Sequence, residues 1–338
     1  MKKSLFLGTL AALGMTAGFA SAGTLQDIQA AGVLKCGVGT GTAGFAAPNA
    51  SGYWEGIDVA VCRAVAAAVL NDKDAVEFVP LTSKVRFSSL NSGEVDMLSR
   101  TTTWTFSRDV DLALTFVGVN YYDGQGFLVP NELGVSSALE LDGATVCIQT
   151  GTTTELNIAD YFRVNGMTYE PVPIDTAAEA QASYLAGACD VYTTDASALA
   201  SSRSTFENPG EHTILPEIIS KEPLGPLVRH GDDQWADVVR WVMNSLIAAE
   251  ELGITSANLE SLAGGSDNPE INRFMGTEGT LGDMLGLDAT WAAQAVSAGG
   301  NYGEIFEATV GESTPIGLAR GLNAQWTQGG LMYSPPFR

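Results

Sequence analysis

Short apolar segments alternate with longer amphipathic ones along most of this chain, in two similar groups. The first group has strand-like and helix-like segments in turn at 33–38, 57–70, 75–81, 82–91 and 95–98. The second has them at 144–149, 153–164, 168–174, 176–186 and 189–193. Strands alternating with helices are typical of parallel sheets covered by helices. The pattern therefore predicts two α/β units.

The two units share short sequence similarities at matching points. Residues 76–81 resemble residues 169–174, and residues 90–96 resemble residues 185–190. Chance similarity between common αβ turns is the alternative. We predict one βαβαβ plan used twice, because a solenoid would need more copies.

The second unit is followed by an extended segment, a long helix and a tail. Residues 219–228 contain two prolines, which disfavour helix, whereas 234–252 carry apolar residues on one helical face. The tail is rich in glycine, with helical patches near 288–298 and 316–324. We expect it to fold against the first unit.

The first residues are typical of a secretory leader. Lys2 and Lys3 precede an apolar run that ends in Ala20-Ser21-Ala22, a small-x-small cleavage site. The run is too short and too interrupted by glycine for a transmembrane helix. We expect residues 1–22 to be removed, with cleavage near Ala22.

Composition narrows the possible partners. The chain has 338 residues, 45% of them hydrophobic, and a formal charge of −22, which becomes more negative once Lys2 and Lys3 are removed. That length allows two domains with substantial cores. The charge repels phosphate backbones, so nucleic acid is not an expected partner. The negative charge is explained simply if it keeps an exported protein soluble. It does not by itself indicate any particular ligand.

Four cysteines in an exported chain favour disulfides, although sequence alone allows three connectivities. Cys36 and Cys62 lie in the first unit, and Cys147 and Cys189 in the second. Pairing within each unit predicts Cys36–Cys62 and Cys147–Cys189. The alternative, a metal site, lacks any C-x-x-C spacing, and the histidines are few. We expect neither a metal nor another cofactor.

Ligands of such sheets bind beyond the carboxyl ends of the strands. Two polar loops lie there, at 99–109 and 193–197. Within the first, Arg108 stands among threonines including Thr101 and Thr103, and a guanidinium can hold a carboxylate through two hydrogen bonds. A surface ion pair with Asp109 is the alternative role. Opposing charges on the two loops would suit a zwitterion.

The second unit offers two further groups. Asp195 can accept hydrogen bonds from an ammonium, although capping a helix is its competing role. Thr152-x-x-Glu155 fits a capping box, and Gly151 would let a ligand approach the helix start closely. Thr152 and Thr153 are therefore candidate ligand contacts as well as capping residues.

Aromatic residues near the end of the first strand are candidates for stacking on a ligand. They are Phe45, Tyr53 and Trp54, in surroundings rich in glycine and alanine. Filling the wall between the two units is the alternative. We expect at least one contact and assign the role to Phe45 and Trp54.

Several motifs resemble those of a known family. They lie at 52–58, 98–109, 120–126, 149–155, 192–195 and 220–226, and more specific ones at 299–306 and 321–333. They resemble the solute-binding proteins of polar amino-acid ABC transporters (solute-binding protein family 3), and within these the general L-amino-acid-binding proteins. The resemblance covers essentially the whole mature chain.

The resemblance implies a two-lobed periplasmic binding protein (type II) fold with a hinge of two crossover segments, near 120–124 and 219–222. One lobe would comprise residues 23–121 and 221–338, and the other 122–220. Arg108 would bind the α-carboxylate, assisted by Thr101, Thr103, Thr152 and Thr153. Asp195 would bind the α-ammonium.

The resemblance also implies function: a periplasmic monomer that binds free L-amino acids with broad specificity and docks transiently on inner-membrane ABC permease subunits. The first alternative is an enzyme on the same scaffold, similar to cyclohexadienyl dehydratase. An enzyme needs an acid and a base near its substrate, and neither His212 nor His230 lies in the candidate loops. The second alternative, a receptor's sensing module, needs a signalling segment that we do not expect here. Binding is the predicted function.

Overall fold

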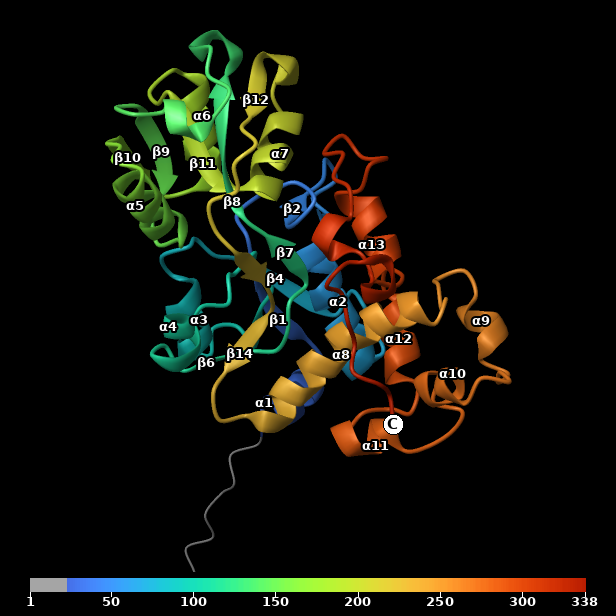
Figure 1. Ribbon diagram of the computed structural model, residues 1–338. Coiled ribbons are helices and arrows are strands. Elements are labelled where there is room, and N and C mark those ends of the chain that lie inside the picture. The colour runs from blue at the N-terminus through green and yellow to red at the C-terminus, as the bar shows by residue number, and fades with distance from the viewer. Residues whose placement is uncertain (1–22) are drawn as a thin grey trace, which may run out of the picture.

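The computed structural model describes residues 23–338. The predicted leader, 1–22, lies outside the described residues. Figure 1 shows two lobes, one above the other, with the C-terminal part of the chain packed beside the lower lobe. The arrangement predicted from the alternation of strands and helices is confirmed.

The first lobe is built on a mixed sheet that, within residues 23–338, has five strands in the order β4-β1-β5-β14-β6. The first three are parallel, whereas β14 is antiparallel to both of its neighbours. Its strands are β1 (Leu34–Val38), β4 (Val76–Pro80), β5 (Met97–Leu98), β6 (Leu114–Phe116) and β14 (Leu227–Arg229). The predicted parallel core is therefore correct, and returning segments of the chain extend it.

Helix α2 (Ile57–Leu70) begins and ends at the predicted residues. Apart from Asp58 and Arg63 its residues are apolar, and most of its surface is therefore buried. It lies between β1 and the helices α8 (Asp233–Glu251) and α12 (Trp291–Ser297). Cys62 of α2 is bonded to Cys36 of β1, as predicted. The other elements of this part are α1 (Thr24–Ala31), β2 (Ala47–Pro48), β3 (Trp54–Glu55), α3 (Arg86–Ser92) and α4 (Phe106–Val110).

The second lobe repeats the plan of the first. Its sheet, counted over the described chain, also has five strands, ordered β10-β9-β11-β8-β12. These are β8 (Gln125–Pro130), β9 (Thr145–Gln149), β10 (Glu170–Ile174), β11 (Val191–Asp195) and β12 (His212–Ile214), with helices α5 (Thr154–Val164), α6 (Ala177–Leu185) and α7 (Ala196–Ser204). The predicted bond between Cys147 and Cys189 is formed.

Equivalent aspartates mark the repeat. Asp96 accepts a hydrogen bond from the backbone N–H of Lys35 at 2.8 Å, and Asp190 accepts one from the backbone N–H of Thr145 at 2.8 Å. Each aspartate directly precedes the third strand of its βαβαβ unit, β5 or β11, and bonds to the first part of that unit's first strand, β1 or β9. The sequence similarity between 90–96 and 185–190 therefore reflects one structural role used twice.

Residues 258–338, here termed the C-terminal extension, pack against α2 and α8, as predicted. Its helices are α9 (Leu259–Leu262), α10 (Pro269–Phe274), α11 (Leu281–Leu285), α12 and α13 (Tyr302–Thr309). The predicted helical patch at 316–324 is wrong, because only a short 3-10 turn, η4 (Gly321–Asn323), forms there. Gly317 and Gly321 have φ of 70° and 50°, in the left-handed region where a right-handed helix ends.

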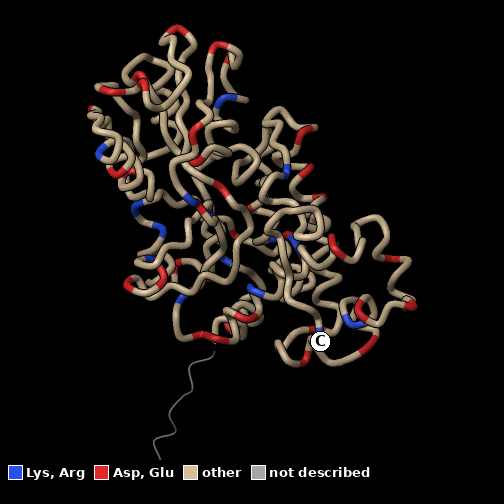
Figure 2. The backbone as a smooth tube through the Cα atoms, viewed as in Figure 1, with Lys and Arg blue, Asp and Glu red and all other residues tan. Residues whose placement is uncertain are grey.

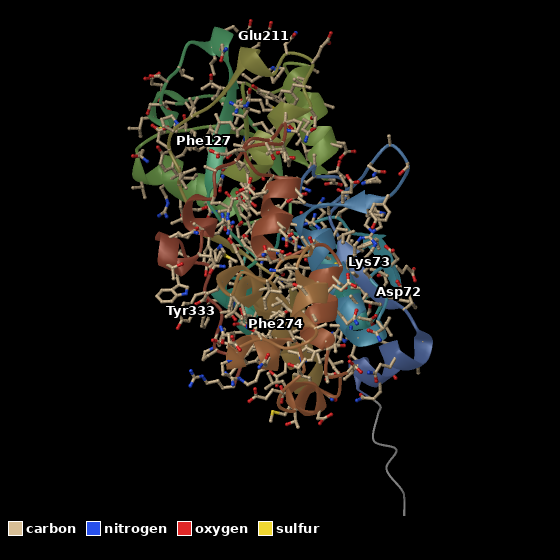
Figure 3. The ribbon with its side chains drawn as sticks, turned by 90° about the vertical axis from the view of Figure 1, so that its right-hand side faces the viewer. Asp72, Lys73, Phe127, Glu211, Phe274 and Tyr333 are labelled. Atoms are coloured by element: carbon tan, nitrogen blue, oxygen red, sulfur yellow. A yellow bond between two sulfur atoms is a disulfide. The ribbon has the colours of Figure 1, made fainter. Side chains whose placement is uncertain are left out.

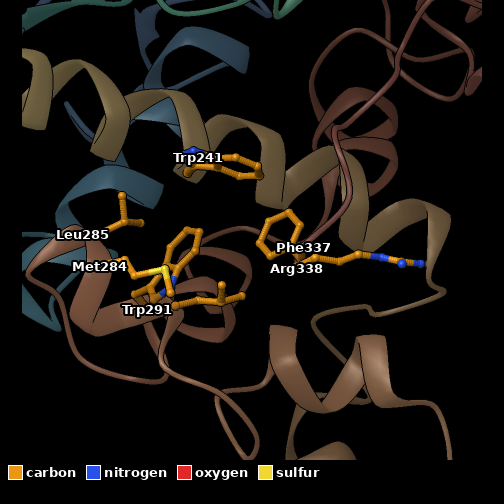
Figure 4. Close-up of a pocket in the computed structure, with 7 residues that line it drawn as sticks. Trp241, Met284, Leu285, Trp291, Phe337 and Arg338 are labelled. Carbon is orange, nitrogen blue, oxygen red and sulfur yellow. The ribbon is translucent and has the colours of Figure 1, made fainter.

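The chain end is anchored in the core of the first lobe. Phe337 is 2% exposed and lies between Trp241 and Trp291, with ring centroids 5.3 and 5.9 Å away, beside a small apolar pocket (Figure 4). Figure 3 shows Phe274 within this part and Phe127 within the other lobe. Each lobe therefore has a core of its own.

Two short strands connect the lobes. They are β7 (Tyr121–Asp123) and β13 (Glu222–Leu224), which pair antiparallel with Tyr122 opposite Pro223.

Acidic residues are spread over both lobes and the extension rather than gathered on one face (Figure 2). Across the described range, no helix is long and apolar enough to cross a membrane.

Candidate functional site

Polar side chains from both lobes meet in a small cavity of about 40 Å³. It lies beyond the carboxyl ends of the parallel strands, where ligands of α/β sheets bind. The first lobe contributes Ser83, Arg86, Arg100, Thr101, Thr103 and Arg108. The second contributes Gln149, Thr152, Thr153, Thr154, Thr194 and Asp195. The structure thus brings together six of the residues expected from the sequence: Arg108, Thr101, Thr103, Thr152, Thr153 and Asp195.

The two expected aromatic residues lie elsewhere. Phe45 is 1% exposed and meets Tyr121 edge-on in the core, with centroids 5.2 Å apart. Trp54, in the β2–β3 hairpin, packs on Phe78 at 5.9 Å and lines a separate pocket beside α13. The hairpin folds over the start of α2, so neither ring is among the described residues that line the cavity.

Arg108 is positioned by the start of α4. The hydroxyl of Thr105 caps this helix by accepting from the N–H of Arg108, and Nη1 of Arg108 donates to the Thr103 carbonyl at 2.9 Å. The surface ion pair considered from the sequence is not formed in the described structure, since Asp109 accepts from Nε1 of Trp104. Burial lowers the pKa of Arg108, opposed by Glu222 and Asp195.

Thr101 has a left-handed backbone, with φ of 37°. Its N–H donates to Oδ2 of Asp58 at 2.8 Å, and Oδ1 of Asp58 accepts from Ser99 and from Asn120. Such a conformation persists only where the surroundings enforce it. Asp58, whose pKa is raised by burial, therefore holds the cavity loop in place and connects it to the hinge.

Two further guanidinium groups line the cavity, which the sequence reasoning did not assign to the ligand. Nη1 of Arg86 donates to Thr102 at 3.2 Å and Nη2 to the Gly151 carbonyl of the other lobe at 3.4 Å. Its buried Nε has no partner among the described residues. Arg100 donates to Ser83 at 3.0 Å and to the Leu81 carbonyl at 2.8 Å.

Burial and repulsion between neighbouring guanidinium groups lower the pKa values of Arg86 and Arg100. Burial, with Arg100 and Arg108 nearby, lowers the pKa of Arg86 well below its ordinary value. Burial also lowers the pKa of Arg100 to about 10. Arg86 lies just after the loop that follows β4. Ligands bind beyond the carboxyl ends of the parallel strands, so including the loop after β4 in the sequence analysis would have predicted Arg86 as a cavity residue.

Asp195 brings a carboxylate to the cavity, and two more carboxylates, those of Asp123 and Glu222, lie near it. Asp195 occupies the N-cap position of α7, but within the described chain its side chain caps no backbone N–H. The side chain of Asp123 instead accepts hydrogen bonds near the start of α7, from the N–H and hydroxyl of Ser197 and from the Gly124 N–H at 2.8 Å. Burial and the neighbouring Asp123 and Glu222 raise the pKa of Asp195 well above its ordinary value. Burial, opposed by these hydrogen bonds, raises the pKa of Asp123 to about 6.

The capping box expected at Thr152 is wrong. Helix α5 begins at Thr154, and the hydroxyl of Thr152 donates back to the Gln149 carbonyl at 2.6 Å. Glu155 accepts from the N–H of Gly151 at 2.8 Å. The carboxylate of Glu155 therefore bonds to the turn before the helix at Gly151 and not to Thr152.

The cavity presents guanidinium groups, hydroxyls and carboxylates, a set suited to hold a small zwitterion. Neither His212 nor His230 is among the described residues that line it. Residues 23–338 contain no group of three or more His, Cys, Asp or Glu side chains that could hold a metal ion.

Comparison with known proteins identifies the family. The model of bacterial extracellular solute-binding proteins, family 3, matches residues 34–257. The chain belongs to this family. Over the full length of both chains it is 64% identical to the glutamate/glutamine/aspartate/asparagine-binding protein BztA of Rhodobacter capsulatus. It is 54% identical, also over both full lengths, to the general L-amino acid-binding periplasmic protein AapJ of Rhizobium johnstonii.

A solved structure of the family has the same fold. It is an ABC transporter periplasmic binding protein from Brucella ovis with glutathione bound, 55% identical, with a TM-score of 0.91. The match covers 94% of this chain and 100% of the other. The two-lobed fold and the family predicted from sequence motifs are thereby confirmed. The chain is a solute-binding protein and not a dehydratase, because the relatives that match its full length are named as binding proteins.

Proposed function

We propose that this protein captures free L-amino acids in the cavity between its lobes and delivers them to an ABC transporter. Arg108, with the backbone or hydroxyl groups of Thr101, Thr103, Thr152 and Thr153, would hold the α-carboxylate. Asp195 would hold the α-ammonium. Opposite charges on the two lobes support this orientation, since each end of a zwitterion then meets its counterion.

We further propose that acidic amino acids and their amides are preferred ligands. The observation that carries this proposal is the buried Nε of Arg86, which has no partner among the described residues and belongs to a residue that lines the cavity beside Arg108. Arg108 would hold the α-carboxylate, so Arg86 would remain for the ligand side chain. A buried donor without an acceptor is costly, and a carboxylate or amide oxygen on the ligand side chain would remove that cost. The name of the relative BztA, which includes glutamate, glutamine, aspartate and asparagine, supports the same class.

Breadth of specificity follows from how the ligand would be held. The contacts to the α-groups are common to all amino acids, and the name of AapJ describes a general L-amino acid-binding protein. Glutathione, bound in the structure from Brucella ovis, carries a glutamyl group with free α-amino and α-carboxyl groups. It therefore belongs among the ligands to be tested.

The remaining features concern the setting of the protein. We propose export to the periplasm with cleavage near Ala22, a monomeric state, and transient docking on permease subunits of the inner membrane. Residues 23–121 with 221–338 would move as one body against 122–220. A signal-like N-terminus and relatives named as transporter-binding or periplasmic proteins support the export and the link to a transporter.

Calorimetry with purified mature protein tests the ligand assignment. The panel comprises glutamate, glutamine, aspartate, asparagine, alanine, leucine, lysine and glutathione. We expect the four acidic and amide ligands to bind more tightly than alanine and leucine. Equal affinity across the panel would contradict the side-chain role of Arg86 but not general amino-acid binding, and absence of all binding would contradict both.

A further inference from the structure

The C-terminal extension occupies the outer edge of hinge strand β7. The N–H of Tyr122 donates to Oδ1 of Asn323 at 2.7 Å, and Nδ2 of Asn323 donates to the carbonyl of Tyr122 at 3.1 Å. One side-chain amide therefore pairs with both backbone groups of one hinge residue, as the peptide of a neighbouring strand would.

The register of the hinge explains why Tyr122 needs this partner. Tyr122 stands opposite Pro223, whose carbonyl accepts from the N–H of Trp104 at 2.8 Å on the side away from β7. Tyr122 and Pro223 thus form a non-hydrogen-bonded pair of the antiparallel ribbon, because Pro223 has no N–H to donate. The two residues of such a pair direct their backbone groups to the outer edges of the ribbon. The free edge of β7 would leave two backbone groups unpaired, and Asn323, itself 3% exposed, supplies both partners.

A second contact fixes the residue before the strand. The hydroxyl of Tyr302, from α13, donates to the carbonyl of Asn120 at 2.9 Å. Asn120 also donates to the buried Asp58, which holds the cavity loop at Thr101. The extension is thus connected through one residue to the ligand loop as well as to the hinge.

Asn323 is itself held firmly on the first lobe. Arg320 donates to the Asn323 carbonyl from Nε at 3.0 Å and from Nη2 at 2.8 Å. The same guanidinium pairs with both carboxylate oxygens of Glu250 in α8, at 2.9 and 3.0 Å. Paired, planar contacts of this kind fix geometry as well as adding energy.

We infer that Tyr302, Arg320 and Asn323 form a hinge brace: they hold residues 120–122 on the first lobe, one residue beyond the lobe boundary proposed at 121. The brace confines bending to 123–124 and 220–222, which limits how far and how readily the lobes open. The brace lies in residues 258–338, beyond the range matched by the family model. The inference rests on the proposed closing of the lobes around a ligand, but it concerns the protein before any ligand binds.

The chain offers a matched control for Asn323. Asn272, also in the extension, accepts from the Ser266 N–H at 2.7 Å and donates to the Ser266 carbonyl at 2.9 Å. The pairing is the same, but it closes a loop beside α10 rather than the hinge. Asn323→Ala and Asn272→Ala therefore remove equivalent hydrogen bonds at different places.

The experiment measures amide exchange at Tyr122 and the distance distribution between spin labels on the two lobes, both without ligand. We expect Asn323→Ala to speed exchange at Tyr122 by about tenfold, the loss of one hydrogen bond, and to widen the distribution. Asn272→Ala should change neither. Because both measurements use ligand-free protein, they stand independently of whether amino acids bind.

Equal behaviour of the two variants would overturn the inference, whatever their melting temperatures. Should Asn323→Ala fail to fold, Tyr302→Phe removes only the hydroxyl that bonds to Asn120. That variant should widen the distribution of interlobe distances while leaving the buried ring in place. An unchanged distribution in Tyr302→Phe would contradict the brace equally.

Discussion

Thr103 and Thr153 lie on different lobes, yet their hydroxyl oxygens are 3.5 Å apart and both donate to the same oxygen of Glu222. The other carboxylate oxygen of Glu222 accepts from Asn157 and from Ser220, each at 2.7 Å. Glu222, 1% exposed, belongs to the hinge. One hinge carboxylate thus bonds to both walls of the cavity, which is possible only while the lobes are together.

Glu222→Gln should disfavour closing. A carboxamide accepts at one atom only, so its NH₂ group would face two of the four donors now served. Hydrogen bonds to a buried charge are worth about 1.5–3 kcal/mol, so we expect affinity for amino acids to fall about tenfold or more by calorimetry. Scattering should show a smaller ligand-induced decrease in radius of gyration than in the unaltered protein.

The control for this variant is Glu217→Gln. Glu217 also accepts from a hydroxyl and a backbone N–H, those of Ser137 and Ala138, but all three lie in the second lobe. The Glu217→Gln variant should have a lower melting temperature, but its affinity for amino acids should change by no more than about twofold. Equal losses of affinity in the two variants would show that Glu222 acts on stability alone.

Arg108→Ala should weaken every amino-acid ligand at least tenfold, because removing one partner of a desolvated charge pair costs about 2–5 kcal/mol. Arg108→Lys should not restore full affinity, since an ammonium cannot make the paired contact. Calorimetry on both variants, with ligand-free melting curves to check folding, tests this. Arg163→Ala, which removes an exposed pair with Asp160, is the control. Unchanged affinity in Arg108→Ala would point to Arg100 as the carboxylate ligand.

Arg86→Met should alter selectivity rather than binding in general. Methionine fills similar apolar space but offers no donor, so glutamate and glutamine should lose affinity by about tenfold or more, on the scale of one buried charged hydrogen bond. Alanine should change far less. The ratio of glutamate to alanine affinity is the measurement, and a parallel loss for both ligands would assign Arg86 to the α-carboxylate or to the contact with Gly151.

Affinity should rise with pH between about 4 and 6.5. Burial raises the pKa of Asp123 to about 6, and Asp195, Glu222 and Tyr121 surround it. With a raised pKa, the ligand-free folded chain binds more protons than the unfolded chain in the window from about 4, the ordinary value, to about 6. The contribution of the Asp123 carboxyl to the stability of the ligand-free protein therefore decreases as pH rises through that window.

A bound ammonium favours the ionised carboxylates, so ligand binding should release protons near pH 6. Calorimetry in buffers of different ionisation enthalpy measures that release, and Asp123→Asn should diminish it. Affinity that stays constant from pH 5 to 7.5, with no proton release, would show that these carboxyl groups are already ionised in the ligand-free protein.

The sequence predicted the elements whose causes are local. Helix α2 was placed to the residue because its apolar run from Ile57 to Leu70 has no internal breaker, and both disulfides followed from cysteines grouped within one unit. Arg108, Thr103 and Asp195 were found because the carboxyl ends of parallel strands meet at one edge of a sheet. Periodicity and strand order suffice for such assignments.

What remained was decided by contacts between distant segments. Phe45 and Trp54 are turned from the cavity by packing against Tyr121, Phe78 and α13, which no spacing in the sequence reveals. Arg86 became a cavity residue through its reach to Gly151 on the other lobe. The pairing of Tyr122 with Asn323 joins residues 201 positions apart, and it exists because the register opposite Pro223 leaves an unpaired strand edge that only the folded extension can cover.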